Sequence, residues 1–237
     1  KWLSEILPEV VRTTTLAAES RVNRFYRNGG TSAVHKEIDL LDGDYVKAHY
    51  ANLLMKQPVA AKEYATIVNS VASELNSDHY LSEFLANNLN KFMQTRESTE
   101  ALFAATNNMG SDHYKTQVIK EALRSQKASA ESVKIIMVSV SKMESDHYKT
   151  EVLTTLLNQD NLSDAVMAEM INATKSIQSD YYRSEVLSIA LERTLSPSSY
   201  QLVVESVKGI DSDHYITEVL KSMLDKPIDS QVLTNLL

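Results

Sequence analysis

Four copies of the string Ser-Asp-His-Tyr begin at residues 77, 111, 145 and 212, and a Ser-Asp-Tyr-Tyr copy begins at residue 179. An aspartate beside a histidine is a pairing that can orient a general base or supply two ligands to a metal ion. The serine of the same string adds a candidate nucleophile. The first question is therefore whether the chain repeats a chemical site or a structural element.

A zinc site would need three or four ligands at about 2.0–2.3 Å. His79, His113 and His147 occupy equivalent positions, but packed helices lie about 8–10 Å apart, so each gap offers at most two imidazoles. Tyr181 takes the histidine position in the fifth string and interrupts the row. We therefore expect no metal and no cofactor. A metal-dependent or pH-dependent sensor built on the histidines stays as the alternative.

Catalysis by the same strings is disfavoured, because five equivalent active sites in one chain would be very unusual. Ser111 and Ser145 are the candidate nucleophiles, and each is better explained as a helix N-cap. The sequence contains neither a glycine-rich phosphate loop nor a His-Glu-x-x-His motif. We therefore expect this chain not to be an enzyme.

The spacing of the strings indicates a structural repeat. Their closing tyrosines follow one another at intervals of 34, 34, 34 and 33 residues: Tyr80, Tyr114, Tyr148, Tyr182 and Tyr215. Tyr45, in the degenerate copy "DGDY", lies 35 residues before the first of them and completes six units. The tyrosine is kept in all six units, whereas Tyr181 and Asp44 replace the histidine. A fixed period of this length is typical of a helical repeat array.

Each unit is predicted to contain two amphipathic helices, A before the string and B after it. Apolar residues follow a 3.6-residue period in both segments. In one unit the stripe of helix B is Val152, Leu153, Leu156 and Leu157, and that of the preceding helix A is Val133, Ile136, Met137, Val140 and Met143. One such pair cannot bury its apolar faces alone, but stacked pairs can. The predicted fold class is an all-α solenoid, an α-α superhelix of about six 34-residue helix pairs with an N-terminal helical cap.

The string is expected to build the start of helix B. Its Ser or Asp should accept hydrogen bonds from the first N–H groups of helix B, where Asp also suits the helix dipole. Its Tyr should be largely buried between units. Lys115, Lys149 and Arg183 follow Asp at i+3, and such pairs add only a few tenths of a kcal/mol. The structural signature comprises Asp78, Tyr80, Asp112, Tyr114, Asp146, Tyr148, Asp180, Tyr182, Asp213 and Tyr215.

The predicted organisation is an N-terminal pair of capping helices over residues 1–30, followed by one continuous solenoid domain over residues 31–237. "NGG" at 28–30 should end the earlier helix, with glycine free to adopt positive φ. "IDSQVLTNLL", from Ile228 onward, resembles the first helix of a seventh unit. Because the chain starts without methionine and stops within a helical pattern, it is interpreted as part of a larger protein.

Composition narrows the partner classes. The chain has 237 residues, no cysteine and a net charge of −7. A nucleic-acid surface needs a basic stripe, so no nucleic-acid partner is expected. No apolar run approaches the roughly 20 residues of a membrane span, so no membrane insertion by this segment is expected. We expect a protein or peptide partner, which the sequence does not identify.

The outer face of helix B repeats Ser or Thr followed by an acid or amide, and stacking would align these positions. The predicted partner-binding ladder is Glu83, Gln117, Glu151, Glu185 and Glu218. In solenoids one helix layer lines the groove in which extended partners dock. The competing interpretation is a solvated helix face or a hydrogen-bond network between repeats. The run Arg21, Arg24 and Arg27 is interpreted as a solvated face as well.

The tetratricopeptide and pentatricopeptide signatures are missing. "SDYYRSEVLSIAL" and "SDHYKTEVLTTLL" instead resemble the "SDY…EVL" type of HEAT-like repeat found in bacterial proteins. The resemblance covers about residues 31–237, and "DGDY" departs from it in the first unit. It implies a protein-interaction scaffold, often in envelope-associated or membrane-anchored signalling proteins, and so a periplasmic or envelope-associated location rather than a cytoplasmic one.

Overall fold

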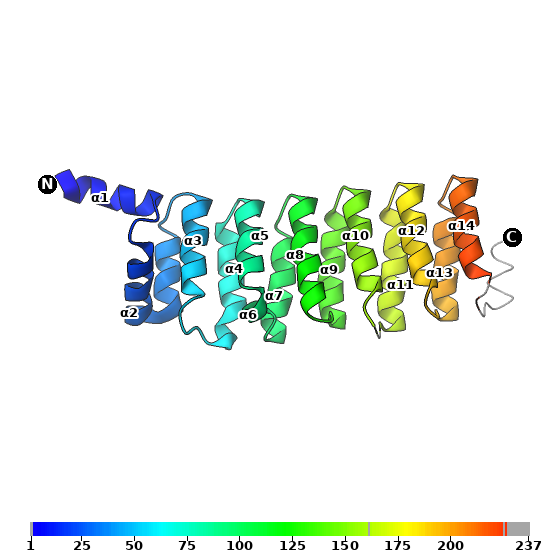
Figure 1. Ribbon diagram of the computed structural model, residues 1–237, viewed down its shortest axis with the longest axis horizontal. Coiled ribbons are helices and arrows are strands. Elements are labelled where there is room, and N and C mark those ends of the chain that lie inside the picture. The colour runs from blue at the N-terminus through cyan, green and yellow to red at the C-terminus, as the bar shows by residue number, and fades with distance from the viewer. Residues whose placement is uncertain (1, 161, 225, 227–237) are drawn as a thin grey trace. The chain divides into compact units, whose positions relative to one another are not determined.

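The computed structural model describes residues 2–160, 162–224 and 226, and within these ranges its regular secondary structure is helical throughout (Figure 1). The chain divides into two compact units, residues 1–122 and residues 123–237. The predicted all-α solenoid class, with paired helices in sequential order, is confirmed. The predicted boundary at residue 30 stays a prediction, and the helix predicted from Ile228 lies outside the described residues.

In the first unit, the helices alternate between an A layer and a B layer. They are α1 (Trp2–Thr13), α2 (Ala18–Ile38), α3 (Asp44–Leu54), the 3-10 helix η1 (Ala61–Glu63), α4 (Tyr64–Glu74), α5 (Asp78–Asn87), α6 (Leu89–Phe92) and α7 (Arg96–Thr106). The helix α8 (Asp112–Ser125) begins in this unit and ends in the second. The B helix α3 packs on α5, and the A helix α4 packs on α7. A helices therefore pack on A helices and B helices on B helices, as the repeat predicts.

The chain reverses direction inside α2, at Gly29 and Gly30 (Figure 1). Gly30 has φ 62° and ψ −155°, a region that is open almost only to glycine. The predicted helix end at "NGG" is confirmed, because both glycines have non-helical dihedrals. Residues 31–38 then form helix A of the first repeat, and α3 is its helix B.

The second unit continues the same order. Its helices are α9 (Ala130–Lys142), α10 (Asp146–Leu157), α11 (Asp164–Ala173), the 3-10 helix η2 (Thr174–Ser176), α12 (Asp180–Leu191), α13 (Pro197–Val207) and α14 (Asp213–Met223). The A helices pack as α9 on α11 and α11 on α13, while the B helices pack as α10 on α12 and α12 on α14. The helix labels in Figure 1 follow this order from green to red.

The apolar stripes predicted from the 3.6-residue period form the core. Val152, Leu153, Leu156 and Leu157 of α10 are all buried. The stripe of α9 is buried except for Met137, which is half-buried. Leu224, the C-cap residue of α14, is 79% exposed. Burial of about 25 cal/mol per Å² of apolar surface makes these stripes the main stabilising term.

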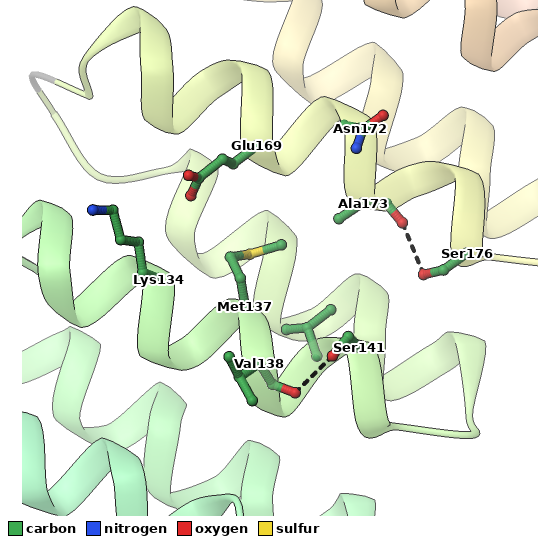
Figure 2. A pocket seen from close by; sticks show the side chains of 9 residues that line it. Lys134, Met137, Val138, Ser141, Glu169, Asn172, Ala173 and Ser176 are labelled. Carbon is green, nitrogen blue, oxygen red and sulfur yellow. Dashed lines mark hydrogen bonds between the residues drawn. The ribbon is translucent and has the colours of Figure 1, made fainter.

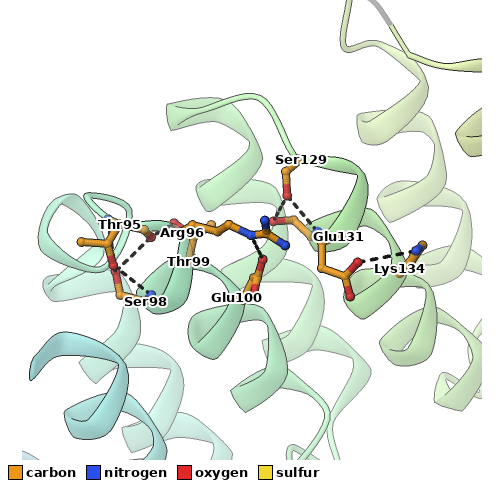
Figure 3. Close-up of polar contacts among 9 residues, drawn as sticks. Thr95, Arg96, Ser98, Thr99, Glu100, Ser129, Glu131 and Lys134 are labelled. Carbon is orange, nitrogen blue, oxygen red and sulfur yellow. Dashed lines mark hydrogen bonds and ion pairs between the residues drawn. The ribbon is translucent and has the colours of Figure 1, made fainter. Parts of the chain in front are cut away.

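The A helices α7, α9, α11 and α13 begin at side-chain caps. Thr95 accepts a hydrogen bond from the backbone N–H of Ser98, and the Ser98 hydroxyl accepts one from the backbone N–H of Thr95, which forms a capping box at α7 (Figure 3). Ser129 caps α9 in the same way, by accepting from the N–H of Ser132. Ser196 caps α13 by accepting from the N–H of Ser199, and Pro197 follows it in the first turn. A cap removed by substitution with alanine costs about 1 kcal/mol.

Candidate partner-binding surface

Within each unit, aspartates in the first turn of helix B reach across to the next repeat. Oδ2 of Asp78 accepts hydrogen bonds from the backbone N–H groups of Gly110 (2.9 Å) and Ser111 (2.6 Å). These donors belong to the A–B turn, the short segment that joins helix A to helix B. Three other aspartates repeat the arrangement with the turns that follow them: Asp44 with Asn76 and Ser77, Asp146 with Gln178 and Ser179, and Asp180 with Asp211 and Ser212.

The predicted role of the string as a local cap is therefore wrong in part. Ser77, Ser179 and Ser212 occupy the N-cap positions of α5, α12 and α14, but their side chains make no capping hydrogen bond. The aspartate lies in the first helical turn, where its charge suits the helix dipole. Its side-chain oxygen satisfies N–H groups of a neighbouring repeat, which would otherwise be left at a helix end.

In front of the first repeat, a backbone carbonyl accepts the hydrogen bond that an aspartate accepts in later repeats. The N–H of Asp42, in the A–B turn before α3, donates to the carbonyl oxygen of Arg12 at 3.0 Å. Arg12 lies in the last turn of α1. The C-terminal end of α1 therefore supplies to the first turn the acceptor that a preceding string would supply elsewhere.

The basic residue three positions after the aspartate is buried, although only a weak surface pair was predicted. Lys149 is 7% exposed, and its ammonium donates to the carbonyl oxygen of Ser176 at 2.9 Å while lying 3.6 Å from Oδ1 of Asp146. Arg183 is also 7% exposed and donates to the carbonyl oxygens of Ile177 and Gly209. Aspartate and base together satisfy both N–H and C=O groups of an A–B turn, which is a strong form of polar contact between repeats.

The tyrosines and histidines of the strings form a row of touching rings. In the first unit Tyr45 and Tyr80 have ring centroids 5.9 Å apart, His79 lies 5.0 Å from Tyr80, and His79 lies 5.9 Å from Tyr114 of the next repeat. The second unit repeats this order. There the neighbouring pairs are Tyr148 with His147, His147 with Tyr182, Tyr182 with Tyr181, Tyr181 with Tyr215, and Tyr215 with His214, at 5.0–6.0 Å.

The burial of the tyrosines is partial, because Tyr148 and Tyr182 are half-buried. The predicted register of the first unit is wrong: Asp44 binds the next turn as Asp78 does, so it takes the aspartate position rather than the histidine position. Tyr45, which is 55% exposed, therefore takes the histidine position. The tyrosine rings lie beside each other at the helix B ends, while the base at i+3 takes the inner position. His147 is exposed, and Tyr181 at the equivalent position is 52% exposed. The rings therefore present partly accessible faces to solvent. We call this row, together with the carboxylates described next, the aromatic–acidic ladder.

The predicted acidic ladder lies one helical turn beyond the histidine position. Glu83, Gln117 and Glu218 are exposed, and Glu151 and Glu185 are half-buried. A carboxylate oxygen of Glu83 lies 4.0 Å from Nε2 of His79. The Ser or Thr before each of these positions is buried in four of the five repeats. The carboxylates thus share an outer helix face with the rings.

His79 packs on Tyr80 and Tyr114, and His147 packs on Tyr148 and Tyr182, so these histidines contact tyrosines. Within the described ranges, no three His, Asp or Glu side chains gather closely enough to hold a metal ion. The Asp and His side chains of one string also have different partners. The Asp146 carboxylate faces the next A–B turn, whereas the His147 ring packs on Tyr148 and Tyr182.

A shallow pocket of about 390 Å³ lies between α9 and α11 (Figure 2). Met137, Val138 and Ala173 form its apolar part, and Lys134 and Glu169 lie at one end. Met137 was predicted as a core residue, but the space beside α11 leaves it half-buried. No repeat-level signal in the sequence indicates this pocket, because it depends on how far the two A helices are separated.

A second hollow, of about 490 Å³, surrounds His35 and Ser70 in the first unit. Ser70 Oγ lies 3.1 Å from Nδ1 of His35, while Nε2 is buried without a protein partner. Burial lowers the pKa of His35 from its usual 6.5, against the opposing influence of Asp39 and Glu63. His35 lies outside the strings, so the repeat analysis missed it.

Arg21 also differs from its predicted solvated position. Its guanidinium donates to the Val11 carbonyl oxygen (2.9 Å) and to the Tyr50 hydroxyl (2.7 Å), and it pairs with Glu37. Both side chains of this ion pair are mostly buried. Arg21 thereby ties α1 to the first repeat.

No protein-family model matches this chain, and a comparison with curated proteins finds no match either. A solved structure described as "Computational Design of Self-Assembling Cyclic Protein Homooligomers" covers 98% of this chain and 81% of its own, at 11% identity and a TM-score of 0.18. A likeness at that level carries no argument about fold or function. Among the described residues, no helix is both long and apolar enough to cross a bilayer.

Proposed function

We propose that this chain is a non-enzymatic α-solenoid module that binds a protein or peptide partner along the aromatic–acidic ladder. The observation that carries the proposal is the ring row of the second unit, where a solvent-accessible aromatic group recurs in each repeat. Aromatic side chains are enriched where proteins bind one another. A row aligned with the repeat fits an extended partner, which presents its own side chains at regular intervals.

The division of labour within the string supports this proposal. Asp146 and Lys149 are occupied by the next A–B turn, so they hold the repeats together. His147 and Tyr181 are exposed and are not needed to satisfy buried polar groups. A repeated residue without a stabilising task is a better candidate for recognition than for packing. Resemblance to bacterial HEAT-like scaffolds is in keeping with this role and is itself part of the proposal.

Random peptides displayed on phage provide a test that needs no knowledge of the natural partner. Peptides selected on the wild-type chain are measured against the triple variant His147→Ser, Tyr181→Ser and His214→Ser, which changes exposed ring positions only. The control variant is Lys175→Ala with Glu205→Ala, an exposed ion pair on the A layer.

We expect the triple variant to lose about tenfold or more in affinity, because three ring contacts of about 0.5–1 kcal/mol each are removed. The control should bind like the wild type. Circular dichroism establishes that both variants keep their helices. The proposal fails if no peptide is selected, or if every selected peptide binds the triple variant as tightly as the wild type. For the metal-dependent alternative, zinc titration by calorimetry is the discriminating measurement.

A further inference from the structure

The exposed charge beside the rings of the second unit is mainly negative. Glu185 and Glu218 lie on α12 and α14, one turn beyond Tyr181 and His214. The basic residues near the same helix starts do not offset this charge at the surface, because Lys149 and Arg183 are buried against backbone carbonyls. Lys221, on the last of these helices, is exposed and pairs with Glu218 at 2.9 Å.

Ring faces and carboxylates attract the same kind of ligand group. The face of a tyrosine carries negative electrostatic potential and attracts an ammonium or guanidinium group within about 6 Å. A carboxylate adjacent to the ring adds a charged hydrogen-bond acceptor, and arginine can stack on the ring while pairing with the carboxylate. An acidic partner side chain would instead be repelled, so the ladder discriminates by sign of charge.

The repeat also sets the spacing of the partner's side chains. The steps of 5.0 Å from Tyr182 to Tyr181 and 6.0 Å from Tyr181 to Tyr215 keep successive tyrosine rings within about 11 Å. Packed helices are themselves about 8–10 Å apart. An extended segment in the polyproline II conformation advances about 3.1 Å per residue and places every third side chain on the same face, so about three residues span one repeat.

We propose that the ladder of the second unit binds an extended peptide segment with arginine or lysine at every third position. This inference rests on the proposed function and adds the charge and the spacing of the partner. Each cationic side chain lies over a ring of one repeat and pairs with the carboxylate of that helix. The intervening residues of the segment make no sequence-specific contact with the ladder.

The probe is a synthetic peptide with arginine at every third position and serine or alanine between, measured by calorimetry on the full chain. A peptide of the same composition, with its arginines moved to alternate positions in one part of the peptide, tests the spacing. A peptide with glutamate in place of arginine tests the sign. The variant Glu185→Gln with Glu218→Gln removes ladder charge, and Glu169→Gln with Glu192→Gln removes the same charge from exposed positions elsewhere.

We expect the peptide with arginine at every third position to bind at least tenfold more tightly than either comparison peptide. The ladder variant should weaken its binding about tenfold and reduce its salt dependence, whereas the matched variant should change the affinity less than twofold. Equal losses in the two glutamine variants would mean general attraction to an acidic chain and would overturn the inference. If phage-selected peptides bind through the rings but lack basic residues, the partner chemistry is wrong while the proposed function stands.

Discussion

Removing a single aspartate should uncouple the last repeat of the second unit. Oδ2 of Asp180 accepts from the N–H groups of Asp211 (3.2 Å) and Ser212 (3.0 Å), which open the turn before α14. A hydrogen bond to a charged group contributes about 1.5–3 kcal/mol. Both N–H groups can be partly rehydrated, because Asp211 is exposed and Ser212 is half-buried. We therefore expect Asp180→Ala to cost about 2 kcal/mol, and Asp180→Asn about 1 kcal/mol.

The matched control is Asp213→Ala. Asp213 occupies the same first-turn position in α14 and is exposed, and its carboxylate has no hydrogen-bonded partner among the described residues. It should lose only the helix-dipole contribution, about 0.3–1 kcal/mol. Urea unfolding gives the overall change, and amide hydrogen exchange gives the local one, which matters because repeat arrays need not unfold in two states. Equal destabilisation by the two alanine variants, with unchanged protection at Asp211 and Ser212, would refute the reasoning.

Three further predictions follow from burial and partners. Tyr200 is 2% exposed, so Tyr200→Ala should lower the free energy of unfolding in urea by about 3–5 kcal/mol. Tyr182→Ala should lower it by less than about 2 kcal/mol, and equal losses would contradict the half-buried position of the Tyr182 ring. Lys149→Ala should lower the free energy of unfolding by about 2 kcal/mol, because it leaves the Ser176 carbonyl without its donor. Lys149→Leu should lower it less, since Leu81 packs at the equivalent position, and the reverse order would contradict this explanation. Burial lowers the pKa of His35, so the unfolded chain binds more protons than the folded one. Thermal stability should therefore fall as the pH drops below about 6.5. The same dependence of the melting temperature on pH in a His35→Gln variant would show that another group is responsible.

The repeat itself was predictable because it depends on local chemistry. The interval between Tyr148 and Tyr182 and the stripe after each string require only helical periodicity. The cap at Ser196 was predictable for the same reason, since Pro197 in a first turn is a local signal.

The partner of the aspartate could not be predicted from local rules. A serine or aspartate before a helix predicts a cap, yet the donors to Asp180 lie 31 and 32 residues further along the chain. Hydrophobicity also predicted the wrong residue for the inner position. Tyr182 ranks as more apolar than Arg183, but the arginine is buried because the next turn supplies carbonyl acceptors for it. Such acceptors become visible only when two repeats are placed side by side.

The candidate surface was predictable in part. Glu185 and its equivalents were placed on an outer helix face from spacing alone, and the structure leaves them exposed or half-buried. The rings were assigned to the interior, so their contribution to the surface was missed. The hollow around His35 and the pocket beside Met137 depend on the distances between helices, which periodicity does not encode.

The hydrogen bonds from each A–B turn to the preceding aspartate give the array a direction. Within each unit, described repeats present an aspartate acceptor toward one end and two N–H donors toward the other, and the carbonyl of Arg12 binds one of the equivalent donors in front of the first repeat. A junction of this kind is interchangeable, because any repeat with the string fits any neighbour with the turn. Copying or deleting a whole repeat in the gene would therefore change the length of the protein without creating a new interface. Selection could adjust the reach of such a chain one module at a time.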